Sequence, residues 1–179
     1  ARMVVAHSMG GAVTLLAMRD GMRLDAVALL APAVRLEHAL APFQRRFHIP
    51  DGAMAGLRAR IEDRFGSDVW TDVAADRIAA ELDVPALVVH DLTDRQVDHS
   101  DVQLLVAAWR TATLTTSTGL GHMRILRDPE VTDQIVTFLT SHLPDREPTP
   151  QPASRLALRR AAADRQRALP AVEAEPVAK

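Results

Sequence analysis

One serine stands where a strand is expected to turn sharply into a helix. Residues 2–6 contain an apolar run, Met3-Val4-Val5-Ala6, with two β-branched valines, which is typical of a buried strand, and residues 10–19 favour a helix. Between them, Ala6-His7-Ser8-Met9-Gly10 matches the pattern G-x-S-x-G with alanine in the first glycine's place. Such a turn would present the Ser8 hydroxyl, and the Met9 amide at the helix N-terminus would point at a developing oxyanion. We therefore take Ser8 as a candidate nucleophile.

A serine hydroxyl becomes a good nucleophile only when a base takes its proton, and the base is usually histidine. Of the seven histidines, His122 stands in Gly119-Leu120-Gly121-His122, after an expected strand at 112–118. Active sites of open parallel sheets gather at the carboxyl ends of strands. His7 adjoins Ser8 but is expected to point away, and His38 is expected to lie in or beside a helix without an acidic partner. We expect His122 to be the base.

The base in turn needs a carboxylate that fixes its tautomer and stabilises the imidazolium. A strand expected at 86–90 runs into His90-Asp91-Leu92-Thr93-Asp94-Arg95-Gln96-Val97-Asp98. Asp94 lies in the loop at the strand's carboxyl end and ranks first, Asp91 second and Asp98 third. A metal site is a weaker alternative, because the spacing of its candidate ligands follows no known pattern; these are His90, Asp94, Asp98, His99 and Asp101.

Short apolar strands alternate with helices along the first 143 residues. The strands are expected at 2–6, 26–31, 86–90 and 112–118. Helix 10–19 has an apolar face of Val13, Leu16 and Ala17, Ser100 is placed to cap a helix at 101–110, and Asp128 with Pro129 begins the last helix. This alternation predicts the α/β class, with a mainly parallel sheet flanked by helices.

The segment 35–83 is longer than the connection between two parallel strands requires, and it shows only helical patterns. Leu57, Ile61 and Phe65 form one stripe, and Ala74 to Leu82 form another helix with Ile78 and Leu82 inward. Such an insertion between strands is typical of a cap over a site. Its apolar residues suit an acyl or alkyl group, although plain packing explains them equally well; they are Phe43, Phe47, Met54, Leu57 and Trp70.

Residues 144–179 differ in composition from the rest of the chain, since they are rich in proline and arginine. We expect them to be disordered or partly helical. A nucleic-acid-binding or membrane-binding arm is a weaker alternative, because Asp164, Glu173 and Glu175 dilute the positive charge.

The composition excludes several classes of protein. With no cysteine, the chain has no disulfide scaffold, no cysteine nucleophile and no thiolate metal site. A net charge of −2 and a pI near 6.4 argue against a nucleic-acid partner. No apolar run approaches the roughly 20 residues that cross a bilayer. We expect a cytoplasmic protein.

Three segments together resemble the α/β-hydrolase superfamily. AHSMGG resembles its nucleophile elbow, VVHDLTDRQV its acid loop and GLGHMRILRDPEV its histidine loop, in the order Ser8, Asp94, His122. Many members have H-G-x-x-D in the acid loop; Asp94 takes the place of the last residue and Asp91 replaces the glycine. The resemblance spans residues 2–143 and implies that strands upstream of the elbow, with a second oxyanion amide, lie outside this sequence.

The resemblance implies a serine hydrolase that cleaves carboxylic esters or related small acyl substrates through an acyl-enzyme. Ser8, Asp94 and His122 would be catalytic, the Met9 amide would hold the oxyanion, and Phe43, Phe47, Met54 and Trp70 would contact the substrate. Neither a cofactor nor a metal ion is required. Peroxidase-like or thioesterase chemistry uses the same triad. The alternatives are a non-catalytic binding protein of this fold or an inactive fragment, and we expect this sequence alone to be nearly inactive.

Overall fold

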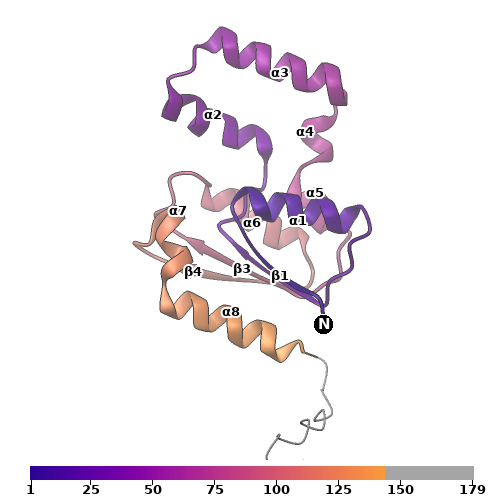
Figure 1. Ribbon diagram of the computed structural model, residues 1–179, viewed down its shortest axis with the longest axis vertical. Coiled ribbons are helices and arrows are strands. Elements are labelled where there is room, and N and C mark those ends of the chain that lie inside the picture. Colours follow the sequence, from indigo (N-terminus) through magenta and orange to yellow (C-terminus); the bar gives the residue numbers. More distant parts are fainter. Residues whose placement is uncertain (144–179) are drawn as a thin grey trace, which may run out of the picture. The chain divides into compact units, whose positions relative to one another are not determined.

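Four parallel strands form one sheet in the computed structural model, which describes residues 1–143 (Figure 1). The strands are β1 (Met3–His7), β2 (Ala26–Leu30), β3 (Ala86–Asp91) and β4 (Ala112–Ser117), and they lie side by side in chain order. The register runs without interruption, with His7 opposite Leu30 and Asp91 opposite Ser117. The predicted α/β class is confirmed, and each strand boundary lies within one residue of its expected position.

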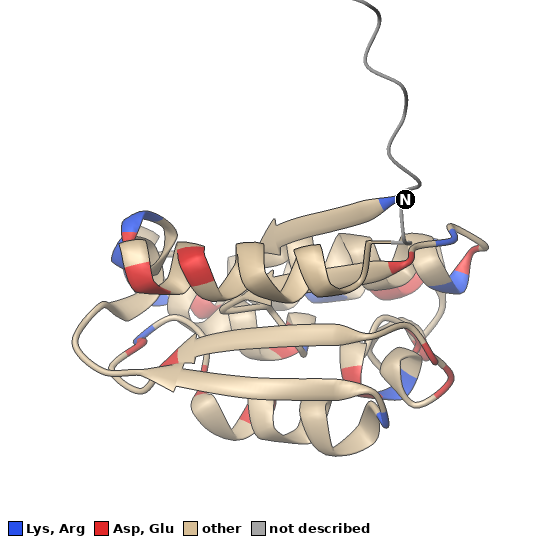
Figure 2. Cartoon of the chain, turned by 90° about the horizontal axis from the view of Figure 1, so that it is seen from below, with Lys and Arg blue, Asp and Glu red and all other residues tan. Residues whose placement is uncertain are grey.

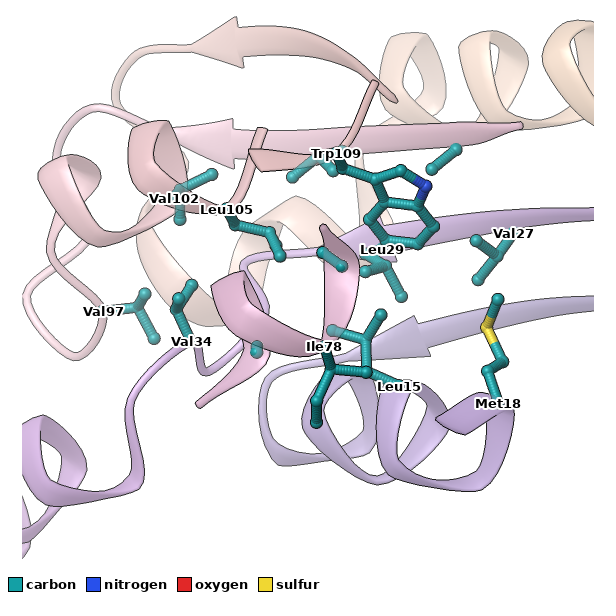
Figure 3. Close-up of a cluster of buried hydrophobic side chains, with 14 residues drawn as sticks. Leu15, Met18, Val27, Leu29, Val34, Ile78, Val97, Val102, Leu105 and Trp109 are labelled. Carbon is teal, nitrogen blue, oxygen red and sulfur yellow. The ribbon is translucent and has the colours of Figure 1, made fainter. Parts of the chain in front are cut away.

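The two central strands are buried on both faces, as the apolar runs predict. Every residue of β2 and β3 is buried. Val27 and Leu29 pack toward one face with Trp109 (Figure 3), whereas Ala28 and Leu30 pack toward the other. Charged residues lie almost entirely outside the strands, which are tan nearly throughout Figure 2. The sheet is therefore a rigid apolar platform from which loops carry the polar groups.

Helices cover both faces of this sheet. One face packs against α1 (Met9–Arg19), α5 (Ala75–Ala79) and α6 (His99–Ala108), and the Trp109 indole after α6 donates to the Val84 carbonyl at 3.0 Å. The other face packs against a single-turn 3-10 helix, η1 (Ile125–Arg127), and against α8 (Pro129–Ser141). A short helix, α7 (Gly121–Arg124), precedes them. The helix expected after Asp128 is confirmed, since its carboxylate accepts from the Val131 amide at 3.1 Å.

The buried face of α1 differs from the expected one. Gly11, Thr14, Leu15 and Met18 are buried, whereas Val13 is 58% exposed and Leu16 and Ala17 are only half-buried. Apolar residues occur nearly all round this helix, so periodicity alone leaves the inward face open. The inward side of the helix includes Gly11, which lies against Pro32.

The N-cap residue of α6 also differs from the predicted one. Asp98, and not Ser100, is the N-cap residue, and its Oδ1 accepts from the Ser100 amide at 2.9 Å and from the Ser100 hydroxyl at 2.7 Å. A carboxylate binds the free amides at a helix N-terminus more strongly than a neutral hydroxyl does. The helix consequently begins at His99, two residues before the expected start.

Residues 35–83 contain only helices, as predicted: α2 (Leu36–Phe47), α3 (Asp51–Phe65), α4 (Val69–Asp72) and α5. In Figure 1, α2 and α3 stand beyond the layer of α1, away from the sheet. Only Met54 of α3 is buried, and the expected stripe leaves Phe65 63% exposed. The helix expected from Ala74 to Leu82 ends early, at Ala79. The expectation for residues 144–179 lies outside the described residues.

The close approach of α1 to Pro32 predicts a sharp difference between two neighbouring glycines. A Cβ at Gly11 would lie 2.8 Å from the Pro32 Cβ, whereas a Cβ at Gly10 would lie 3.9 Å from the Ala6 Cβ, an ordinary contact. We expect Gly11→Ala to lower the free energy of unfolding by about 1–3 kcal/mol. Gly10→Ala should be neutral or stabilising by up to about 1 kcal/mol. Urea unfolding of the two variants measures the difference, and equal effects would contradict the packing described.

Candidate active site

Ser8 occupies a strained turn between β1 and α1. Its φ of 54° and ψ of −124° lie where residues other than glycine are rarely found. The Ser8 amide donates to the Leu30 carbonyl, and the Ser8 carbonyl accepts from the amides of Gly11 and Ala33, all at 3.0 Å. Such a backbone conformation costs about 1–3 kcal/mol and persists only where the surroundings enforce it. These three hydrogen bonds hold the serine at the carboxyl edge of the sheet.

His122 reaches Ser8 from the loop that follows β4. Gly119 and Gly121 have φ values of 91° and 63°, so this loop uses conformations that favour glycine. The buried imidazole lies with its Nε2 atom 2.9 Å from the Ser8 Oγ atom. The structure therefore brings together two residues that are 114 positions apart in the chain.

Asp94 completes a chain of hydrogen bonds that ends at the backbone. Its Oδ2 atom lies 2.7 Å from His122 Nδ1, and its Oδ1 atom accepts from the amides of Gln96 at 2.7 Å and Val97 at 3.1 Å. A carboxylate can only accept, so Nδ1 carries the proton, and Nε2 of the neutral ring accepts from the Ser8 hydroxyl. Burial would raise the pKa of Asp94, but the hydrogen bonds from His122, Gln96 and Val97 outweigh it and lower that pKa.

Asp91 has a different position from Asp94, although only two residues separate them. Its buried carboxylate accepts from the Thr93 amide, the Ser117 hydroxyl and the Leu120 amide at 2.8–2.9 Å. It thus ties the end of β3 to the end of β4 and to the loop that carries His122. Burial would raise the pKa of Asp91, but hydrogen bonds from Thr93 and from the loop amides hold it well below its usual range. Asp98 caps α6 and lies outside the hydrogen-bonded chain.

His7 does not point away from the site, contrary to the sequence-based expectation. Its Nε2 atom donates to the His122 carbonyl at 2.9 Å, and the two ring centroids are 4.6 Å apart. Val4 and Ala6 pack toward α1, so strand alternation could have placed His7 on the opposite face. Burial, reinforced by the nearby His122 ring, lowers the pKa of His7 despite the hydrogen bond to that carbonyl.

His38 also differs from the sequence-based expectation. His38 has an acidic partner after all, since its Nδ1 donates to Asp101 Oδ2 at 2.7 Å, and this contact ties α2 to α6. His99 begins α6 and stacks on the buried His90, with ring centroids 5.5 Å apart. Burial lowers the pKa of His90, whose two ring nitrogens have no hydrogen-bond partner within residues 1–143.

Residues 1–143 contain no cluster of three or more potential metal ligands, so the alternative metal site does not form there.

A cavity of about 710 Å³ opens beside Ser8 and Met9. Phe43 and Phe47 line it from α2. Met54 and Trp70 are not among its lining residues, so the interpretation of these two as substrate contacts is not supported by their positions. Met54 is buried within α3, and the Trp70 indole donates to Glu62 Oε1 at 2.7 Å. Periodicity cannot show which apolar residues of 35–83 face the sheet edge and which pack among the helices of that segment.

No helix within residues 1–143 combines the length and the apolar character that a membrane-crossing segment requires.

The lowered pKa values predict a two-step loss of stability in acid. Since the pKa values of His7 and His90 are lowered, the unfolded chain binds more protons than the folded chain once the pH falls below about 6.5. The free energy of unfolding should therefore fall there, and fall again below about pH 4 through Asp91 and Asp94.

The variant His90→Leu should make the first of these two declines shallower. It removes one of the two histidines that take up a proton when the chain unfolds. His48→Asn is the matched control, since His48 is exposed and asparagine tolerates its left-handed backbone. Urea unfolding measured between about pH 8 and pH 5 tests this expectation. Parallel curves for the wild-type protein and His90→Leu would contradict it.

Comparison with known proteins supports the fold through structure alone. No protein-family model and no curated protein sequence matches the chain. Solved structures do match: a Palaeococcus ferrophilus monoacylglycerol lipase at 20% identity and a TM-score of 0.55, and the esterase domain of a Rhodothermus marinus protein at 18% and 0.54. An α/β-hydrolase enzyme from a lagoon-sediment metagenome matches at 12% and 0.53.

These matches cover 78–79% of this chain. In the other direction, the chain spans 68% of the length of the lipase, 60% of the metagenomic enzyme and 59% of the esterase domain. The resemblance expected from the sequence is confirmed at the level of architecture. With its parallel sheet, its helices on both faces and these structural matches, the chain has the α/β-hydrolase fold.

Proposed function

We propose that the protein is a serine hydrolase that cleaves carboxylic esters or related acyl compounds. The observation that carries this proposal is the unbroken line of hydrogen bonds from Ser8 Oγ through His122 to Asp94, at 2.9 Å and 2.7 Å. A nucleophile within hydrogen-bond reach of a base, which a third group orients, is the arrangement that activates a serine. The esterase and lipase among the structural matches support the same class of reaction.

The first half of the proposed reaction forms an acyl-enzyme. Ser8 Oγ attacks the ester carbonyl carbon while His122 Nε2 takes the hydroxyl proton. The carbonyl oxygen gains negative charge, and the Met9 amide, which is in the first turn of α1 and has no acceptor inside the helix, donates to it. The tetrahedral intermediate then expels the alcohol, which receives the proton from His122.

The second half releases the acid and restores the enzyme. A water molecule gives a proton to His122 Nε2 and attacks the acyl carbon, again with the oxyanion beside the Met9 amide. Collapse of this intermediate returns the proton to Ser8 Oγ and frees the carboxylic acid. No cofactor or metal ion takes part in these steps.

Asp94 has two roles in this scheme. It keeps the proton of neutral His122 on Nδ1, so that Nε2 can act as the base, and it stabilises the imidazolium that forms. Because the Gln96 and Val97 amides hold its second oxygen, the carboxylate cannot rotate away from the histidine. Its lowered pKa keeps it ionised at neutral pH.

Phe43 and Phe47 give the acyl chain of the substrate an apolar wall within the same cavity as Ser8.

We also propose that residues 1–143 form the C-terminal part of a hydrolase domain in which residues 35–83 are a cap over the site. The ion pair between Arg35 and Asp76 at 2.9 Å, with the contact between His38 and Asp101, supports a fixed position for the base of that cap.

The proposal predicts covalent labelling at one residue. A fluorophosphonate probe should label the full-length protein, since Ser8 Oγ attacks phosphorus and fluoride leaves. Ser8→Ala should abolish both labelling and hydrolysis of a p-nitrophenyl ester. Ser100→Ala is the matched control, because this serine lies in α6 and should leave labelling unchanged. Labelling that persists in Ser8→Ala would overturn the proposal.

The three aspartates between the end of β3 and the start of α6 should differ in the effect of their substitution. Asp94→Asn should lower turnover by several orders of magnitude, on the order of 10⁴ in the best-studied triad. Asp98→Asn should leave turnover near that of the wild type, since Asp98 only caps α6. Asp91→Asn should chiefly lower the melting temperature, because one carboxylate oxygen that accepts from Ser117 and Leu120 becomes an amide donor. A larger loss of turnover in Asp91→Asn would mean that the acid is misassigned.

A further inference from the structure

Arginines form part of the wall of the cavity beside Ser8. Arg45 and Arg46 come from the last turn of α2, and Arg95 directly follows Asp94 in the loop after β3. No aspartate or glutamate is among the lining residues of this cavity. The wall next to the proposed nucleophile therefore carries three positive charges and no negative charge at neutral pH.

These guanidinium groups have no carboxylate partner at ion-pair distance within residues 1–143, where the arginines that do pair are Arg19, Arg35 and Arg110. Carboxylates are present nearby, since Arg45 and Arg95 also line an adjoining cavity of about 460 Å³ that contains Asp94, Asp98 and Asp101.

Each of these three aspartates already has a different partner. Asp94 accepts from His122, Asp98 accepts from Ser100, and Asp101 accepts from His38. The three arginines are thus left available to an anion that enters the cavity beside Ser8.

Apart from Ser8, Gln96 and the three arginines, the side chains of the wall are apolar. Leu36, Leu40, Phe43, Phe47 and Val97 lie in the same lining as Ser8 and the three arginines. A neutral ester would satisfy the apolar part alone and leave the charged part to water. A molecule with both an apolar chain and an anionic group satisfies both parts of the wall.

We propose that the ester cleaved by Ser8 is an anionic amphiphile, in which an acyl chain lies along the phenylalanines and a carboxylate or phosphate binds to Arg45, Arg46 and Arg95. This inference rests on the proposed serine hydrolase. Arginine suits the role because its planar guanidinium group binds carboxylate and phosphate oxygens in pairs. Arg46 also lies over the Phe47 ring at 5.8 Å from its centroid, so the cationic and apolar parts of the wall are adjacent.

Two matched substrate pairs test the charge of the substrate in the full-length protein. The first pair is p-nitrophenyl hydrogen suberate and its methyl ester, which differ only in the terminal carboxylate. The second pair is 1-octanoylglycerol with and without a 3-phosphate, which separates phosphate from carboxylate. We expect the anionic member of at least one pair to have the higher kcat/KM. Added salt should reduce the ratio of anionic to neutral kcat/KM, because it screens exposed charges.

Variants test which residues recognise the charge. Each of Arg45→Gln, Arg46→Gln and Arg95→Gln should lower that ratio by about twofold to fivefold, the range for solvent-exposed charge pairs. The triple variant should bring the ratio close to one. Arg60→Gln is the matched control, because Arg60 is an exposed arginine of α3 that does not line the cavity. Ratios that are unchanged in the triple variant would overturn the inference, while hydrolysis that still depends on Ser8 would leave the proposed function standing.

A binding measurement keeps the two proposals separate. Calorimetry of the Ser8→Ala variant with decyl phosphate and with decanol needs no turnover. Tighter binding of the phosphate, lost in the triple arginine variant, would show that the arginines select an anionic amphiphile, whether or not the fluorophosphonate probe labels the wild-type protein. Equal binding of the two ligands would overturn it.

Discussion

The parallel pairing of the strands decides where every chemical group of the site lies. Because all four strands run in one direction, the carboxyl ends of β1, β3 and β4 meet at one edge of the sheet. Ser8, Asp94 and His122 each follow one of these ends. Three residues that are distant in the sequence therefore come within hydrogen-bond distance, and helices on both faces hold the sheet that carries them.

The two aspartates that follow β3 illustrate how surroundings divide structural from chemical roles. Asp91 is the last residue of its strand, and its carboxylate binds β4 and the histidine loop. Asp94 lies beyond the turn, where backbone amides hold one oxygen and leave the other to His122. The first carboxylate fixes the loop that carries His122, and the second holds the imidazole ring itself. The Ser8 turn has the same character, since hydrogen bonds to its neighbours hold an otherwise unfavourable backbone conformation.

Much of this arrangement could be predicted because its causes are local. Apolar β-branched runs bounded by turn residues indicated the strands, and Asp128 with Pro129 indicated the start of α8. The order of elbow, acid loop and histidine loop indicated which serine, aspartate and histidine would meet. A parallel sheet leaves little choice for loops that follow its strands, so element order alone placed Ser8, Asp94 and His122 at one edge.

Apart from the N-cap residue of α6 and the end of α5, which are local, the errors concern contacts between elements that are far apart in the chain. The sequence by itself determined where the strands lie in the chain and which residues follow their carboxyl ends, because these depend on neighbouring residues. Only the tertiary structure decided that α1 turns Gly11 inward, that His7 binds the His122 carbonyl, and that His38 meets Asp101. It also decided that Phe43 lines the cavity while Met54 of α3 is buried elsewhere. Each of these outcomes depends on which surface happens to lie opposite, and a local pattern of residue types carries no information about that surface.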